Sequence, residues 1–332
     1  MGLSGLSMAN FDSSLTSPYQ QLVPGQHWTP TINQMWGAPK NSIAFHPYEP
    51  SMYSRATNYK KFGFAHFYTL QGDDIIKHRD KIDRSPYVSD KATYQSALED
   101  ISSTDSNQFI QIITMQNHMP YNDWYADNEF KATAADGADS LGSDEVTAID
   151  TYAKGASITD TETKNFLDEL KQARQAGDGR VLWRPSAGHL RNRQPGYEQF
   201  AGAAFDGFIS YGPNKASGSQ GKKVDNSVYS SPNYFVAQTA EHMNAKVSPY
   251  LAFLTLMHKK VSAMEPPVVN KIQGWDRIPE GQDIYLDAAG NPMAEDEFDE
   301  QTKQLMTDYK LIQYDITAGK NYLKDTDFMD LP

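Results

Sequence analysis

The chain has 332 residues, 39% of them apolar and 22% charged, which is enough apolar material for a buried core. Its formal charge of −12 and the lack of a basic stripe argue against a strong nucleic-acid binder. The chain contains no cysteine, so disulfides, zinc–thiolate sites and cysteine nucleophiles are excluded. We also expect no transmembrane helix and no secretory signal, because no apolar run is long enough and the first residues lack a basic region.

The first elements are short. Residues 1–60 are rich in Pro, Ser, Tyr and Asn and predict irregular chain with short helices. Residues 88–101 (VSDKATYQSALEDI) predict a helix capped by Ser89 or Asp90. Residues 109–115 form an apolar run with β-branched side chains and predict a buried strand. The polar loop QNHMPY follows at once, where open α/β sheets tend to place their sites.

Longer helices are predicted further along the chain. Residues 125–146 are acidic and rich in Gly, Ala and Ser, which indicates a surface loop. Residues 147–175 predict a helix, in which Thr159 begins a TDTE sequence suited to cap or restart it. The remaining predictions are two helices within 232–261 broken at Ser248-Pro249, a short strand at 284–286 and a final helix over 295–316.

Two segments carry candidate chemistry. His118 follows the predicted strand, where an imidazole can hydrogen-bond an anionic ligand or act as a general acid; the alternative is an ordinary loop histidine. Residues 45–55 (FHPYEPSMYSR) are aromatic and end in Arg55, whose guanidinium can hold a phosphate by two parallel hydrogen bonds. The alternative there is a proline-stiffened loop with a solvated arginine. The sequence has no HExxH, GxSxG or Walker motif.

Several segments together resemble one family. They are GLSMANF (5–11), LTSPYQQLVP (15–24), AFHPY (44–48), YSR (53–55), YVSD (87–90), ITMQNHMPYN (113–122), SPYLAFL (248–254) and DYKLIQYDITAGKNYL (308–323). On these motifs the chain resembles the extracellular domain of lipoteichoic-acid-synthase-like phosphoglycerol transferases, in the sulfatase/alkaline-phosphatase superfamily. The resemblance covers about residues 1–175 and 214–332.

The resemblance implies an α/β fold with a mostly parallel central sheet and helices on both faces. It implies one sulfatase-like domain over residues 1–332, incomplete at its N-terminus, with residues 214–332 as its mostly helical last part. The implied function is transfer of glycerol phosphate from phosphatidylglycerol to a lipoteichoic-acid-type polymer. The implied location is the extracellular face of a Gram-positive cell membrane, reached through N-terminal membrane helices that this chain lacks, with no nucleic-acid partner.

The resemblance also implies site residues. Arg55 matches the arginine that binds the phosphate group, and His118 matches the histidine that contacts glycerol phosphate. Tyr53 stands where the family often has an aromatic residue. The family uses a threonine nucleophile activated by Mn²⁺, or by Mg²⁺, since a divalent metal lowers the pKa of a hydroxyl and neutralises phosphoryl charge.

The departures from the family pattern concern catalysis. The family's threonine lies a few residues before GLSMANF, and a glutamate ligand lies further upstream; this chain begins after both. The other metal ligands come from a Tyr-Gly-Asp-His-Leu-Pro-Gly motif expected near Arg184-Pro185, and it is absent there. One choice of codons for residues 180–191 reads Val-Phe-Tyr-Gly-Asp-His-Leu-Pro-Gly-Ile-Tyr when its first base is dropped. The sequence therefore favours a shifted reading frame over 180–213, rather than a divergent insertion.

As written, the chain is expected to be inactive, with no catalytic residue and no metal ligand of its own. Two alternatives to an enzyme remain open at this point. One is a non-catalytic remnant that binds glycerol phosphate or an anionic polymer. The other is a pseudogene product of marginal stability, since a shifted frame replaces a central strand and leaves backbone groups unpaired.

Overall fold

A computed structural model describes residues 2–12, 14–15, 17–35, 39–104, 108–137, 139–173, 181–183, 209–211, 228–242, 245–266 and 282–330. Most of the segment for which a shifted reading frame is predicted, 180–213, lies outside the described residues. Two short strands within it, β4 (Val181–Trp183) and β5 (Ile209–Tyr211), pair with each other in antiparallel fashion. In the described part of the chain, no helix is both long enough and apolar enough to cross a membrane.

A parallel sheet in the order β2-β1-β3 organises the first half of the chain. Its strands are β1 (Ser42–Phe45), β2 (His66–Tyr68) and β3 (Phe109–Ile112). The apolar run at 109–115 correctly predicts β3. The sequence analysis did not predict β1 and β2, because such short strands within a parallel sheet show no apolar–polar alternation.

Helix α4 (Asp90–Ser102) covers one face of this sheet. The helix begins as predicted, because the hydroxyl of Ser89 accepts a hydrogen bond from the backbone N–H of Ala92 at 3.2 Å. Ala97 is fully buried and packs against Ile43 and Phe45 of β1. Since side chains alternate along a strand, Ile43 and Phe45 lie on the same face.

Helix α5 (Ser143–Ala173) packs on α4 and begins earlier than predicted. The carboxylate of Glu145 accepts a hydrogen bond from the N–H of Gly142 at 2.8 Å, which stabilises the first turn. Phe166 stacks on Tyr94 of α4, with ring centroids 4.6 Å apart. The helix runs without a break through Thr159, so the predicted restart there is wrong; the hydroxyl of Thr159 bonds to another helix instead.

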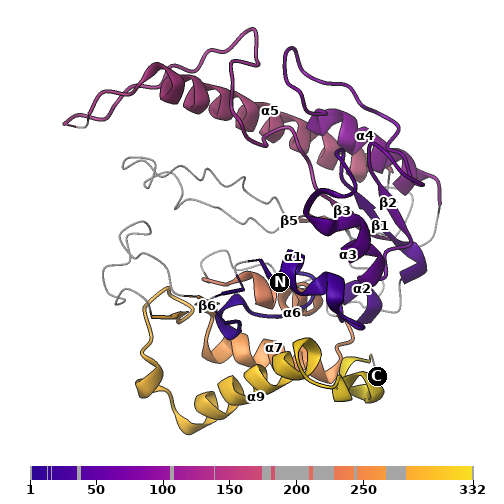
Figure 1. Cartoon of the computed structure of the whole chain (residues 1–332), viewed down its shortest axis with the longest axis vertical. Helices are drawn as coiled ribbons and strands as arrows, with labels where there is room; N and C mark the ends of the chain where they lie inside the picture. Colours follow the sequence, from indigo (N-terminus) through magenta and orange to yellow (C-terminus); the bar gives the residue numbers. More distant parts are fainter. Residues whose placement is uncertain are drawn as a thin grey trace.

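The opposite face of the sheet packs on α3 (Arg55–Lys61). Tyr59 of α3 stacks on Phe67 of β2 at a centroid distance of 4.5 Å, and Ala44 of β1 is buried in the same cluster. Phe109 of β3 joins this cluster to a larger one formed by the C-terminal helices. Helices therefore cover both faces of a parallel sheet, as expected, with α4 and α5 on one side and the C-terminal helices on the other (Figure 1).

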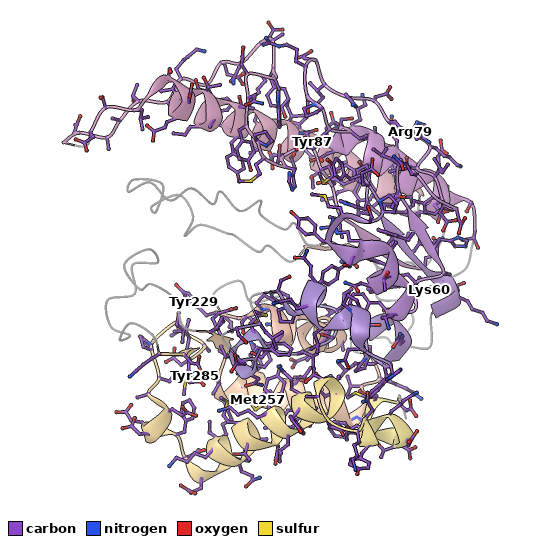
Figure 2. All side chains as sticks on the ribbon, viewed as in Figure 1. Lys60, Arg79, Tyr87, Tyr229, Met257 and Tyr285 are labelled. Atoms are coloured by element: carbon purple, nitrogen blue, oxygen red, sulfur yellow. The ribbon has the colours of Figure 1, made fainter. Side chains whose placement is uncertain are left out.

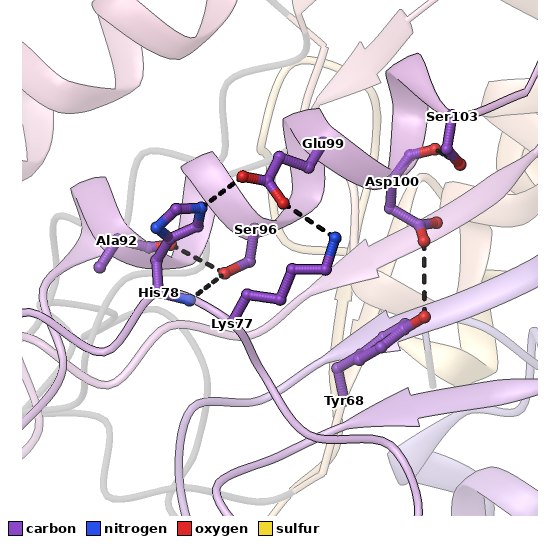
Figure 3. Close-up of polar contacts among 8 residues, drawn as sticks. All are labelled: Tyr68, Lys77, His78, Ala92, Ser96, Glu99, Asp100 and Ser103. Carbon is purple, nitrogen blue, oxygen red and sulfur yellow. Dashed lines mark hydrogen bonds and ion pairs between the residues drawn. The ribbon is translucent and has the colours of Figure 1, made fainter.

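Polar side chains of α4 form ion pairs and hydrogen bonds with the segment that precedes the helix (Figure 3). Glu99 pairs with Lys77 at 2.9 Å and with His78 at 2.7 Å. The hydroxyl of Ser96 accepts a hydrogen bond from the N–H of His78. These exposed contacts orient the segment between β2 and α4 over the helix.

Three helices, α6 (Phe235–His242), α7 (Pro249–Lys260) and α9 (Glu300–Thr317), form the second half. Ser248 caps α7, with Pro249 in the first helical position, so the predicted break is confirmed. The last helix begins later than predicted, because residues 295–297 form a 3₁₀ turn and Asp299 accepts from the N–H of Thr302 at 2.7 Å. The antiparallel pair β6 (Ala263–Glu265) and β7 (Ile284–Leu286) lies beside them, and β7 was predicted.

The largest buried cluster of the described residues lies among these helices. Tyr250, Leu251, Leu254 and Met257 of α7 are all 0% exposed. Met257 lies among the side chains of the C-terminal helices (Figure 2). The helices thus hold a substantial core of their own.

Residues 4–7 run through this cluster as an irregular segment. Tyr250 donates its hydroxyl proton to the carbonyl of Ser4 at 3.0 Å, and Tyr309 donates to the carbonyl of Gly5. Gln313 bonds the N–H and the carbonyl of Ser7, at 2.8 and 3.0 Å. Gly5 has φ of +72°, and a Cβ there would lie 2.5 Å from the side chain of a buried leucine, so only glycine fits.

The remaining elements of the described chain are short. They are α1 (Pro18–Gln21), α2 (Ile32–Met35) and 3₁₀ turns at Met8–Asn10, Val23–Gly25, Pro39–Asn41, Met52–Ser54, Pro232–Tyr234, Glu295–Glu297, Tyr322–Asp325 and Asp327–Met329.

Candidate functional site

The carboxyl ends of β1 and β3 bring two histidines to one edge of the sheet. His46 follows β1 directly, and His118 lies on the loop after β3. Because these strands are adjacent and parallel, the two following segments leave from the same edge. The N–H of Ile113 donates to the carbonyl of Phe45 at 2.8 Å, and this bond extends the pairing of the strands up to the histidines.

His46 is 0% exposed and supports Arg55. Nη1 of Arg55 donates to Nε2 of His46 at 2.7 Å. The other ring nitrogen, Nδ1, lies 3.4 Å from the carbonyl of Ile113, which can only accept. The ring therefore has its proton on Nδ1 and offers the lone pair of Nε2 to the guanidinium.

The imidazole of His46 remains neutral in the folded protein. Burial, followed by the positive charge of Arg55, lowers its pKa to about 3. His118 makes a smaller contribution to the same shift. A neutral acceptor does not cancel the charge of Arg55, and no ion pair between described residues includes Arg55. Among the described residues, nothing therefore neutralises the charge of the guanidinium.

A tight turn places Tyr53 beside this guanidinium. Tyr53 and Ser54 both have left-handed backbones, with φ of 54° and 58°. Non-glycine residues in this region are strained, and such strain is common at binding sites. The ring of Tyr53, 40% exposed, lies under the guanidinium carbon of Arg55 at 5.1 Å from its centroid. This cation–π contact stabilises the arrangement by about 0.5–1 kcal/mol.

His118 is held by Tyr87. The Tyr87 ring meets the imidazole edge-on at 5.6 Å, and its hydroxyl donates to the carbonyl of Met119 at 2.6 Å. Nδ1 of His118 lies 2.7 Å from the same carbonyl and donates to it. No hydrogen bond between described residues uses Nε2 of His118, which is thus available to a substrate oxygen. Tyr87 lies on the side of the sheet that faces α4 and α5 (Figure 2).

Of the three residues that the sequence proposed for binding, the structure places Arg55 and Tyr53 in contact and His118 on the loop that follows the adjacent strand. It adds His46 and Tyr87, to which the sequence analysis assigned no role. The sequence contained a signal for His46, which follows the apolar run of β1 as His118 follows that of β3. This pattern becomes informative only once β1 is known to be a strand that pairs with β3.

The described residues do not provide a metal site. Among them, no group of three or more His, Asp and Glu side chains is close enough to hold an ion. The edge of the sheet offers two imidazoles and a guanidinium, and one imidazole is already bonded to the guanidinium. This donor set suits an anion rather than a divalent cation. The position expected for the Asp-His ligands, near Arg184-Pro185, lies outside the described residues.

Solved structures similar to this chain include a phosphoglycerol transferase. GacH of Streptococcus pyogenes, solved in complex with sn-glycerol-1-phosphate, has 26% identity and a TM-score of 0.73, covering 100% of this chain and 75% of that one. The lipoteichoic acid synthase LtaP of Listeria monocytogenes has 14% identity and a TM-score of 0.55, covering 99% of this chain and 79% of that one. The second likeness shows the fold alone.

A third similar structure is an alkaline phosphatase superfamily protein of Vibrio parahaemolyticus, with 14% identity and a TM-score of 0.50, covering 96% of this chain and 74% of that one. No curated protein matches the chain. The family model described as Sulfatase matches residues 1–245. The fold is that of the sulfatase and alkaline phosphatase superfamily, whose members are enzymes and generally depend on a metal. The chain belongs to the sulfatase family.

Proposed function

We propose that this chain recognises glycerol phosphate at the edge formed by Arg55, His46, Tyr53 and His118. The observation that carries the proposal is the state of Arg55, which is anchored on a neutral imidazole and has no ion-pair partner among the described residues. A guanidinium has five N–H donors, and only some are used by His46. The others suit the oxygens of a phosphate group, while His118 and the ring of Tyr53 flank the glycerol.

The wider role follows from the family. We infer transfer of glycerol phosphate from phosphatidylglycerol to a lipoteichoic-acid-type polymer, at the outer face of a cell membrane. The similar structure of GacH, solved with sn-glycerol-1-phosphate, supports the ligand class. Mn²⁺, or Mg²⁺, would supply charge neutralisation in that chemistry, but the described residues do not fit a metal. The proposal therefore assigns no step to it.

Binding is tested by calorimetric titration of the purified chain with sn-glycerol-1-phosphate. Arg55→Ala should weaken the affinity about 10- to 100-fold, the usual value of charge-assisted hydrogen bonds. Arg84→Ala is the matched control, because that exposed arginine pairs with Asp123 and not with any of the four residues of the proposed site. Affinity unchanged in Arg55→Ala, or no binding at millimolar ligand, would contradict the proposal.

A separate assay decides between an enzyme and a binding-only remnant. The measurement is hydrolysis of a phosphatidylglycerol analogue with added Mn²⁺. Binding without turnover supports the remnant and the predicted inactivity of the chain as written. Turnover that disappears in His118→Gln shows that the chain cleaves the analogue through this site and overturns that prediction.

A further inference from the structure

The loop before His118 is held by hydrogen bonds from two helices. Gln116, which is 1% exposed, accepts from the N–H of Asp90 at 3.0 Å through Oε1. Its Nε2 donates to the carbonyl of Gly155 in α5 at 3.2 Å. Asn117 donates its Nδ2 to the hydroxyl of Thr159 at 2.8 Å. Helices α4 and α5 thus hold the two side chains that precede the site histidine.

The hydroxyl of Thr159 is the centre of this arrangement. It accepts from Nδ2 of Asn117 and, at 3.2 Å, from Nε2 of Gln116. Its own proton goes to Oδ2 of Asp90 at 2.5 Å. A hydroxyl has one donor and two acceptor positions, so all three are used. Each neighbour therefore has a single orientation that satisfies the set.

Burying the carboxyl of Asp90 lowers the stability of the folded protein. Its side chain is 0% exposed, and Oδ1 has no hydrogen-bond partner in the part of the chain that the structure describes. Burial raises the pKa of this carboxyl. A buried carboxyl with an incomplete set of hydrogen bonds is less favourable than a packed apolar side chain. What the carboxyl contributes is an acceptor that directs the proton of Thr159.

Gly155 gives the loop room to approach α5. A Cβ at this position would lie 2.3 Å from Oδ1 of Asn117 and 3.0 Å from the hydroxyl of Tyr125. Glycine lowers the stability of a helix interior, so its presence here needs a local reason. The reason is the close contact with Asn117, which is independent of the hydrogen bonds to Thr159.

The same loop continues into the site. The carbonyl of Asn117 accepts from the hydroxyl of Tyr121 at 3.0 Å, and the N–H of His118 donates to the carbonyl of Met115 at 3.0 Å. The backbone on both sides of the imidazole is thereby restrained. Displacing Asn117 would move the ring relative to Arg55.

We propose that Asp90 and Thr159, which lie behind the site, are positioning residues that set the location of His118 for glycerol phosphate. The inference rests on the proposed function for the identity of the ligand. It goes further by assigning the orientation of the imidazole to a buried set of hydrogen bonds between α4 and α5. Neither residue touches the ligand.

The test compares two valine variants on one helix. Thr159→Val removes the central hydroxyl and keeps the shape of the side chain. Thr161→Val is the control, since its exposed hydroxyl bonds only the carbonyl of Ser157 in the described chain. The affinity for sn-glycerol-1-phosphate should fall about tenfold in Thr159→Val, stay unchanged in the control and recover in Thr159→Ser. The ring NMR signals of His118, assigned with His118→Gln, should shift only in Thr159→Val.

A folded Thr159→Val with unchanged His118 signals overturns the inference, whatever its melting temperature. If that variant does not fold, Gly155→Ala takes its place, because it displaces Asn117 and leaves the hydroxyl present; unshifted ring signals in that variant overturn the inference equally. The NMR readout needs no ligand. A wild-type chain that fails to bind glycerol phosphate therefore contradicts the proposed function alone, while the ring signals still decide the positioning role.

Discussion

The strand edge around Arg55 and the helical cluster around Tyr250 use polar side chains in opposite ways. In the cluster, Tyr250, Tyr309 and Gln313 each bond to the backbone of residues 4–7, so buried polar groups satisfy one another. At the edge, Arg55 donates a hydrogen bond to the neutral imidazole of His46, which does not neutralise the guanidinium. The cluster therefore stabilises the fold, whereas the guanidinium of Arg55 has no ion-pair partner among the described residues.

The largest expected effect concerns the cluster. Leu254→Ala removes a fully buried side chain from α7 and should lower the free energy of unfolding by about 2–5 kcal/mol. The affinity of the folded fraction for sn-glycerol-1-phosphate should not change. Urea unfolding and calorimetric titration measure the two quantities. Leu311→Ala on α9, where the side chain is 60% exposed, is the control. A parallel loss of affinity would show that the two regions are not separable.

The next effect concerns His46 at the strand edge and the dependence of folding stability on pH. The pKa of His46 is about 3 in the folded protein, against an ordinary value of 6.5 in the unfolded chain. As the pH falls below 6.5, the unfolded chain takes up a proton that the folded protein refuses, so stability falls toward pH 3. His46→Gln, which keeps an acceptor for Arg55, lacks this contribution. The slopes of stability against pH should differ by up to about 1.4 kcal/mol per pH unit.

Unfolding by urea at several values between pH 7 and pH 4 checks this difference. The carboxylates titrate in both proteins and therefore cancel in the comparison. Equal slopes for the wild type and His46→Gln would mean that the imidazole is not held neutral, and the description of the charge on Arg55 would then be wrong.

The smallest effect is expected from the exposed pairs on α4. Glu99→Gln removes the partner of Lys77 and His78 in a group where the side chains of Glu99 and Lys77 are 45% and 67% exposed. Exposed pairs add little because solvent and salt screen them. The urea midpoint should shift slightly at low ionic strength and not at all at high ionic strength. A shift of the urea midpoint that persists at high ionic strength would mean that the contacts of Glu99 stabilise the fold as the buried cluster does.

The sequence predicted what local patterns determine. The cap at Ser89, the strand before His118 and the break at Ser248-Pro249 all have short-range signals, and the structure confirms them. The role of His46 could not be read in this way, because it depends on β1 lying beside β3 and on Arg55 reaching back across a tight turn. Thr159 shows the same limit. Its sequence suits a helix start, yet tertiary bonding to Asp90 uses the hydroxyl inside an unbroken helix.

The adjacency of β1 and β3 has a further consequence for how ligand and fold are coupled. The residues at the edge come from segments that are distant along the chain and meet only when these two strands pair. An unfolded chain does not bring these residues together, so a phosphate bound at the proposed site would link segments that are far apart in the sequence. By mass action, a ligand at 100 times its dissociation constant would stabilise the chain by about 2.7 kcal/mol. Glycerol phosphate would then protect α4 and α5 from hydrogen exchange far beyond the few groups it touches.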